Sequence, residues 1–249
     1  MPKIGNFDTD ATALLQRVQS HDKFGTAELN DWIFSNMKVS EGSNVLDVGC
    51  GFGKQTMALL KNGCAVVSVD ASEASIEQLQ KSAEQFTTKL VTIHSEFDSM
   101  LLPQIEFDYV VSAYAFYYSQ DRDHVLSMVS EKMKKGSQIF ICGPAFDNNQ
   151  GMKDLLGKAG VTFGEGSAPF MEEDGPELFK KHFGNVEKLR FENVVRFPSA
   201  DEVWRYWSSH NMFDSAIEDK FKHNLELHFA KEKEFVTTKV AIGLHSFKK

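Results

Sequence analysis

The feature that most constrains this chain is the stretch from Asn44 to Gly53, which reads NVLDVGCGFG. Its apolar residues Val45, Leu46 and Val48 are typical of a strand that is buried on both faces. Glycines then occupy every second position, which permits a tight turn whose backbone N–H groups approach a ligand closely. A helix expected over residues 54–61 would present its N-terminus to the same place. The stretch therefore predicts a strand, a glycine loop that binds a cofactor of nucleotide type, and a helix in direct succession.

Composition and charge exclude several classes of protein. The 249 residues are 42% apolar and 25% charged, as is usual for a globular protein with a sizeable core. The formal charge of −8 argues against a nucleic-acid binder, which normally carries a basic surface. No apolar run approaches the roughly 18 residues that span a bilayer, and the N-terminus does not resemble a signal peptide. We therefore expect a cytoplasmic protein without nucleic-acid or membrane partners.

The cysteines also favour a cytoplasmic protein. Cys50, Cys64 and Cys142 are odd in number, widely spaced, and each next to predicted strand residues. This pattern indicates reduced thiols in the core rather than disulfides or a metal cluster.

Strands and helices alternate after the opening stretch. Apolar runs predict further strands at residues 65–69, 90–94, 107–113 and 138–142. Between these strands, apolar residues at helical spacing predict helices. Ser72 is placed to cap the start of one helix, and another is expected to end at Lys134, Lys135 and Gly136. Such alternation predicts a doubly wound, mostly parallel sheet of the Rossmann type.

The last third of the chain has a different pattern. Alternating apolar residues predict two more strands, at 189–197 and 236–244, which we expect to pair at the sheet edge. The sheet would thus have seven strands, with an antiparallel strand contributed by the C-terminal end of the chain. Helices predicted at 201–210 and 214–231 would form an insertion, over about residues 198–233, that acts as a lid.

The segment from Asn44 to Gly143 resembles the class I S-adenosylmethionine-dependent methyltransferases that act on small molecules. A dinucleotide-binding fingerprint spaces its glycines as G-x-G-x-x-G, whereas here Gly51 is followed by Gly53 and then Lys54. The resemblance implies S-adenosylmethionine as the cofactor. It also implies a domain over residues 44–249, with helices of residues 1–43 folding over the cofactor, where Phe7 and Phe24 are candidates for contact.

The same resemblance assigns the cofactor-binding residues. The methionine part would be held by Asp47, Gly49, Gly51 and Gly53. Asp70, at the end of a strand, would accept hydrogen bonds from both ribose hydroxyls, since a carboxylate offers two acceptor oxygens. Around the adenine we expect Ala71, Glu96 and the backbone N–H of Phe97, with Asp98 as an alternative to Glu96. Ser112 and Ala113 would pass beside the sulfonium.

Candidates for substrate binding and catalysis follow the fourth strand and lie in the lid. Tyr114, Tyr117 and Tyr118 come where the rim of the active site should be. Trp204 is the candidate for substrate contact in the lid, and His210 and Tyr117 are the candidates for catalysis. The stretch around Phe170 and Met171 is predicted to be a surface loop, with a pocket wall as the alternative, and the acids Glu172, Glu173 and Asp174 to be a solvated helix start.

Several functions remain open at this stage. A metal-assisted mechanism is disfavoured because Ala113 and Tyr114 stand where a carboxylate ligand would be needed, and methylation of nucleobase or amide nitrogen because SAYAFYY lacks a [DNS]-P-P-[YF] motif. The predicted reaction is transfer of a methyl group to oxygen, nitrogen or carbon of a small, partly apolar molecule. The alternatives are a nicotinamide-dependent oxidoreductase and a non-catalytic protein that binds S-adenosylmethionine. The sequence does not indicate an oligomeric state.

Overall fold

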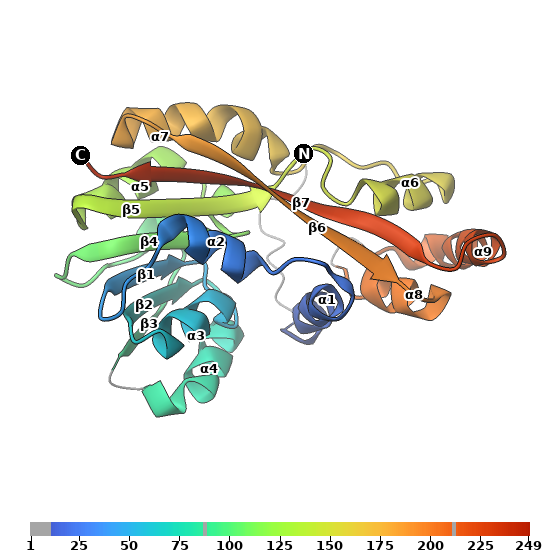
Figure 1. Ribbon diagram of the computed structural model, residues 1–249, viewed down its shortest axis with the longest axis horizontal. Coiled ribbons are helices and arrows are strands. Elements are labelled where there is room, and N and C mark those ends of the chain that lie inside the picture. The colour runs from blue at the N-terminus through green and yellow to red at the C-terminus, as the bar shows by residue number, and fades with distance from the viewer. Residues whose placement is uncertain (1–10, 87–88, 211–212) are drawn as a thin grey trace. The chain divides into compact units, whose positions relative to one another are not determined.

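The computed structural model describes residues 11–86, 89–210 and 213–249, with side chains from residue 16 onward, and it divides into two compact units (Figure 1). The core unit comprises Leu29–Ala145, Ser167–Arg190 and Ile242–Lys249. The appended unit comprises the described residues up to Glu28, together with Phe146–Gly166 and Phe191–Ala241. Phe7 lies outside the described residues.

A seven-stranded sheet has the order β3-β2-β1-β4-β5-β7-β6. Its strands are β1 (Asn44–Val48), β2 (Ala65–Asp70), β3 (Leu90–His94), β4 (Phe107–Ala113), β5 (Met133–Pro144), β6 (Glu187–Phe197) and β7 (Phe235–Phe247). β1 to β5 pair in parallel, in the register Val45 to Val66 and Val45 to Tyr109. β7 runs antiparallel to β5, since near the start of β5 Gly136 N donates to Lys248 O and Lys248 N donates to Ser137 O, just after the end of β7. The predicted class of fold is therefore confirmed.

Helices alternate with these strands. They are α1 (Ala11–Phe24), α2 (Leu29–Met37), α3 (Lys54–Lys61), α4 (Glu73–Ser82), α5 (Arg122–Glu131), α6 (Gln150–Lys158), α7 (Gly175–Phe183), α8 (Ala200–Ser208) and α9 (Glu218–Phe229). Serine caps two helix starts: Ser72, as predicted, accepts a hydrogen bond from Ser75 N, and Ser199 accepts one from Glu202 N.

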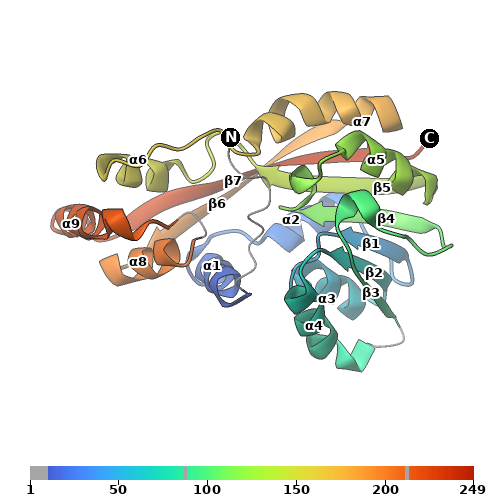
Figure 2. The ribbon, with the colours of Figure 1, turned by 180° about the vertical axis from the view of Figure 1, so that it is seen from behind.

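In the core unit, α2, α3 and α4 pack on one face of the sheet through one apolar cluster, to which Ile33, Leu59 and Leu79 contribute. α5 covers the opposite face, as Figure 2 shows from behind. The three cysteines are reduced and buried, as predicted. This packing leaves the carboxyl ends of the parallel strands to carry the loops, which is where ligands bind in open α/β sheets.

Two expectations for the core unit are wrong. α5 ends at Glu131, and Lys134, Lys135 and Gly136 lie inside β5, because Met133 already pairs with Phe107 across the sheet. The stretch from Phe170 to Asp174 is a π-helical turn rather than a surface loop, with Phe170 and Met171 buried. The three acids at its end precede α7, as expected for a solvated helix start.

The appended unit contains α1, α6, α8 and α9, and its segments of β6 and β7 continue into the core unit. Its core is strongly aromatic and includes Phe197, Tyr206, Trp207 and Phe221. None of the helices in the described part of the chain is both long and apolar enough to cross a bilayer.

Candidate functional site

The glycine loop connects β1 to α3 and is anchored on β2. The backbone N–H groups of Gly49 and Cys50 both donate to the carbonyl of Val69, over 2.7 and 3.0 Å. Gly49, Gly51 and Gly53 have φ angles of 75°, 51° and 82°, which side chains other than glycine rarely adopt. Gly53 directly precedes α3, so the free N–H groups of that helix open toward the loop.

The glycines of the loop differ in what surrounds them. A Cβ on Gly49 would come 2.1 Å from the Cβ of Ala115, and one on Gly53 would come 2.3 Å from Leu79 Cδ1. A Cβ on Gly51 would meet no atom within 4 Å. Gly49 and Gly53 therefore allow close packing of the protein on itself, whereas Gly51 faces open space, as a loop that admits a ligand should.

Asp70 ends β2 beside this loop. Its Oδ2 accepts from Gly51 N over 2.8 Å and its Oδ1 accepts from Ser72 N over 2.9 Å. Two backbone donors thus hold the carboxylate in one orientation. Each oxygen keeps further acceptor capacity, so the group can still receive two ligand hydroxyls.

Asp47 is buried beneath the loop. Its Oδ2 accepts from the Thr56 hydroxyl over 2.6 Å, and Thr56 in turn lies 2.8 Å from the Ser68 hydroxyl. The other carboxylate oxygen, Oδ1, is buried and has no donor within the described residues. Burial raises the pKa of Asp47 to about 7; the nearby Asp70 carboxylate adds to the effect and the Thr56 hydrogen bond opposes it.

The turn after β3 places Glu96 and Asp98 in different roles. Glu96 is exposed, and Phe97 packs its ring against the loop, with Cζ 3.0 Å from the Cβ position of Gly49. Asp98 accepts from Ser119 Oγ and from the backbone of Asp121, both over 2.8 Å. These bonds, together with one from Gln120 N, outweigh its partial burial and lower its pKa. Asp98 therefore holds the loop after β4 in place, whereas the Glu96 carboxylate is exposed and has no such role among the described residues.

The end of β4 is strained. Ser112 is buried with no partner for its hydroxyl in the part of the chain that the structure describes. Tyr114 has a φ of 58°, although it donates its N–H to Cys142 O over 2.8 Å and so remains tied to β5. A bulky residue in this conformation costs on the order of 1–3 kcal/mol and is most often found at functional sites.

Tyr117 and Tyr118 form an aromatic wall after this strand, with ring centroids 4.7 Å apart. Tyr117 packs so closely on β5 that its Cε1 lies 2.7 Å from the Cβ position of Gly143. Burial, with the neighbouring hydroxyls of Tyr118 and Tyr114, raises the pKa of the Tyr117 phenol well above its ordinary value. The phenol of Tyr117 thus stays protonated at neutral pH and can donate a hydrogen bond.

The structure does not group all of the predicted residues in one unit. Those predicted to bind the cofactor and the three tyrosines belong to the core unit, whereas Trp204 and His210 belong to the appended unit. Trp204 packs edge-on against Phe213, with centroids 5.5 Å apart, and His210 stacks on Trp207 at 5.2 Å. Phe24 also lies in the appended unit, 5.5 Å from the ring of Phe197. Their proposed contacts with substrate or cofactor stay predictions.

Some residues that shape the site were missed in the sequence. Thr56 donates to Asp47 and is itself in contact with the Ser68 hydroxyl. The sequence signals were a hydroxyl in the first turn after the glycine loop and another inside an otherwise apolar strand. Arg122 donates to Tyr117 O over 2.7 Å and lies 4.8 Å from the centre of the Phe170 ring. Within the described ranges, no three His, Cys, Asp or Glu side chains converge as a metal site would require.

Known proteins are similar to this chain over parts of its length. Residues 45–136 match the family model of the methyltransferase domain. An uncharacterized methyltransferase from Geobacillus sp. (strain WCH70) is 27% identical over 160 residues, which cover 63% of this chain and 74% of the relative. With further curated relatives the match spans 42–60% of their length.

Solved structures show the same fold. A putative methyltransferase from an antibiotic biosynthesis pathway of Anabaena variabilis superposes with a TM-score of 0.63 at 14% identity, covering 86% of this chain and 95% of the other. An N-methyltransferase 2 of Haemonchus contortus, in complex with phosphomonomethylethanolamine and S-adenosylhomocysteine, gives a TM-score of 0.55 at 15% identity, covering 88% of this chain and 52% of the other. Strand order and glycine loop thus define a methyltransferase fold. These matches support the class I S-adenosylmethionine-dependent methyltransferase family, and none of them supports the nicotinamide alternative.

Proposed function

We propose that this protein binds S-adenosylmethionine on the glycine loop and transfers its methyl group to a small, partly apolar acceptor. The observation that carries the proposal is the combination of open space at Gly51 with the Asp70 carboxylate held beside it by two backbone donors. A vicinal diol placed there would find two acceptor oxygens already oriented, so little ordering is needed on binding.

The two ends of the cofactor have separate candidates. The buried Oδ1 of Asp47 lacks a donor among the residues described, and the ammonium of the methionine part would supply one. The exposed carboxylate of Glu96 is free to accept from the adenine amino group, because Asp98 is used by the loop after β4. Ala71 and Phe97 would border the adenine ring, and Ser112 and Ala113 would pass beside the sulfonium.

When bound, S-adenosylmethionine supplies a methyl group activated by a positively charged sulfur. The protein then has to align the acceptor with that methyl group and exclude water. Tyr114, Tyr117 and Tyr118 offer an aromatic surface for a partly apolar acceptor. Because the Tyr117 phenol stays protonated, its role would be to donate a hydrogen bond to the acceptor rather than to remove a proton. His210 remains our candidate for a base, and Trp204 for a lid contact, in a lid over about residues 198–233.

Two measurements test the proposal. Isothermal titration with S-adenosylmethionine and with NAD should show binding of the first and not of the second. Turnover on a panel of amines, phenols and carboxylic acids, followed as release of S-adenosylhomocysteine, should then reveal an acceptor class. Binding of NAD without binding of S-adenosylmethionine would contradict the proposal. Cofactor binding without turnover on any acceptor would favour a non-catalytic binding protein.

A further inference from the structure

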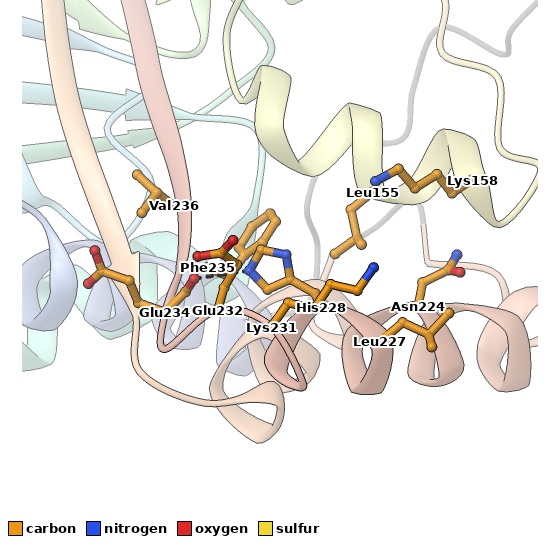
Figure 3. Close-up of a pocket in the computed structure, with 10 residues that line it drawn as sticks. All are labelled: Leu155, Lys158, Asn224, Leu227, His228, Lys231, Glu232, Glu234, Phe235 and Val236. Carbon is orange, nitrogen blue, oxygen red and sulfur yellow. Dashed lines mark hydrogen bonds between the residues drawn. The ribbon is translucent and has the colours of Figure 1, made fainter.

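The appended unit has a pocket of about 600 Å³ that the proposed methyl transfer does not use (Figure 3). Its lining residues come from α6, from α9 with the turn that follows it, and from the start of β7: Leu155, Lys158, Asn224, Leu227, His228, Lys231, Glu232, Glu234, Phe235 and Val236. All of them belong to the appended unit. The volume falls within the range of roughly 300–1,000 Å³ that is usual for small-molecule sites.

The pocket carries uncompensated positive charge. Lys158 enters from the end of α6 and Lys231 from the turn after α9, and Figure 3 shows both among the side chains that line the space. Neither ammonium has an ion pair or a side-chain hydrogen bond within the part of the chain that is described. Of the two lining carboxylates, Glu234 is paired with Arg196 at 2.5 Å, which leaves Glu232 against two lysines. The pocket therefore favours a ligand with negative charge.

An amide in the wall lacks an acceptor. The Nδ2 of Asn224 is buried and has no hydrogen-bond partner among the described residues. A buried donor without an acceptor costs about 1–3 kcal/mol, and a ligand oxygen met by rotation of this side chain would relieve the cost. His228 is fixed by a 2.9 Å contact between its Nε2 and the backbone oxygen of Glu234. That contact fixes the orientation of the His228 ring, with Nδ1 on the side away from Glu234 O.

Apolar surface adjoins these polar groups. Leu227 and Val236 are 52% and 38% exposed, although most side chains of their kind in this chain are buried. Leu155 and Phe235 extend the same surface into the buried core of the unit. Removing such surface from water is worth roughly 25 cal/mol per Å², so a ligand gains by covering it.

We propose that this pocket binds a small organic anion, with a carboxylate or phosphate placed between Lys158 and Lys231 and an apolar arm on Leu155, Leu227 and Val236. The charge selects an anion over a cation of the same shape. The exposed apolar residues select an anion that carries hydrocarbon over an inorganic one.

The test uses the full chain and four probes in isothermal titration: octanoate, octyl phosphate, octylammonium and inorganic phosphate. We expect at least one of the two octyl anions to bind at least about tenfold more tightly than octylammonium and inorganic phosphate, a difference of about 1.4 kcal/mol. Comparing octanoate with octyl phosphate then shows which anionic group the site prefers.

Substitution locates the site. The double variant Lys158→Gln/Lys231→Gln should weaken binding of the preferred anion by at least about tenfold. The matched control Lys220→Gln/Lys233→Gln removes the same charge from exposed positions that do not line the pocket, and it should change the affinity by less than about twofold. Circular dichroism and binding of S-adenosylhomocysteine confirm that both variants are folded. Equal affinities of the two double variants, equal binding of octylammonium, or no anion binding up to about 5 mM would overturn the proposal.

Discussion

Asp47 should make the stability of the protein depend on pH in a direction opposite to that of most carboxylates. Its pKa is about 7 in the folded protein and 3.8 when the side chain is in water. Because the folded state holds the proton more tightly, the contribution of this group to the free energy of unfolding is fully present below about pH 3.8 and is lost as the pH rises through about 7. Replacing Asp47 by Asn removes this titration and keeps an oxygen that can accept from Thr56.

The size of the effect follows from the pKa shift. One unit corresponds to about 1.4 kcal/mol, so a shift from 3.8 to about 7 corresponds to about 4 kcal/mol over the whole pH range. The titration curves of Asp47 in the folded and unfolded states place about 3 kcal/mol of this loss between about pH 5 and pH 8. Over that interval the free energy of unfolding of the native protein should therefore fall, relative to that of Asp47→Asn, by about 3 kcal/mol.

Urea unfolding followed by circular dichroism, at constant ionic strength and several pH values, measures this difference. Asp98→Asn is the control, because the pKa of Asp98 is lowered and its titration lies below the interval. The native protein and Asp98→Asn should share one slope between about pH 5 and pH 8, while Asp47→Asn departs from it. Parallel profiles for all three proteins would show that Asp47 titrates as an ordinary carboxylate, and would refute the reasoning.

Three further outcomes are expected. Asp70→Ala should weaken binding of S-adenosylhomocysteine by about 1–3 kcal/mol in isothermal titration, because the ribose loses a charged acceptor; unchanged affinity would mean that the ribose lies elsewhere. Gly51→Val should fold but bind the same ligand at least about tenfold more weakly, since its side chain would occupy the open space at the loop and its φ of 51° is strained; retained affinity would contradict the loop assignment. Burial lowers the pKa of His245 despite the nearby Glu187, so its contribution to stability is present above about pH 6.5 and is lost as the pH falls toward the folded pKa. His245→Gln should accordingly flatten the decline of the thermal unfolding midpoint on the acid side, and an unaltered decline would assign it to other groups.

The sequence predicted the glycine loop well, because strand, glycines and helix are each specified by neighbouring residues. β1 and α3 begin and end where the pattern placed them, and the three glycines have the positive φ angles expected of the loop. Asp70 likewise lies beside the loop, because it ends β2, the parallel neighbour of β1, and the carboxyl ends of parallel strands meet at the same edge of the sheet. Local signals suffice wherever the structure is made by consecutive residues.

Prediction failed where distant residues decide the structure. The turn from Phe170 to Asp174 reads as a loop, but Phe170 is buried against Phe116, with ring centroids 6.0 Å apart, and against Arg122. Glu96 was predicted with Asp98 as the alternative, and no local pattern reveals the donors at residues 119–121 that the fold brings to Asp98. The assignment of Glu96 to the adenine stays a prediction. The end of α5 was misplaced because pairing with Phe107 converts a helix-like segment into strand.

The first described helix is held by residues from the other end of the chain. Gly25 forms a β-bridge with Val195, and Arg17 donates to the backbone oxygen of Ser209. At about 5–20 residues per second, a ribosome needs on the order of 10–30 s to pass from one side of that bridge to the other. During synthesis α1 must therefore wait, without its partners, while the strands and helices of the core unit emerge. A factor that binds nascent chains would meet this helix long before the unit that buries it exists.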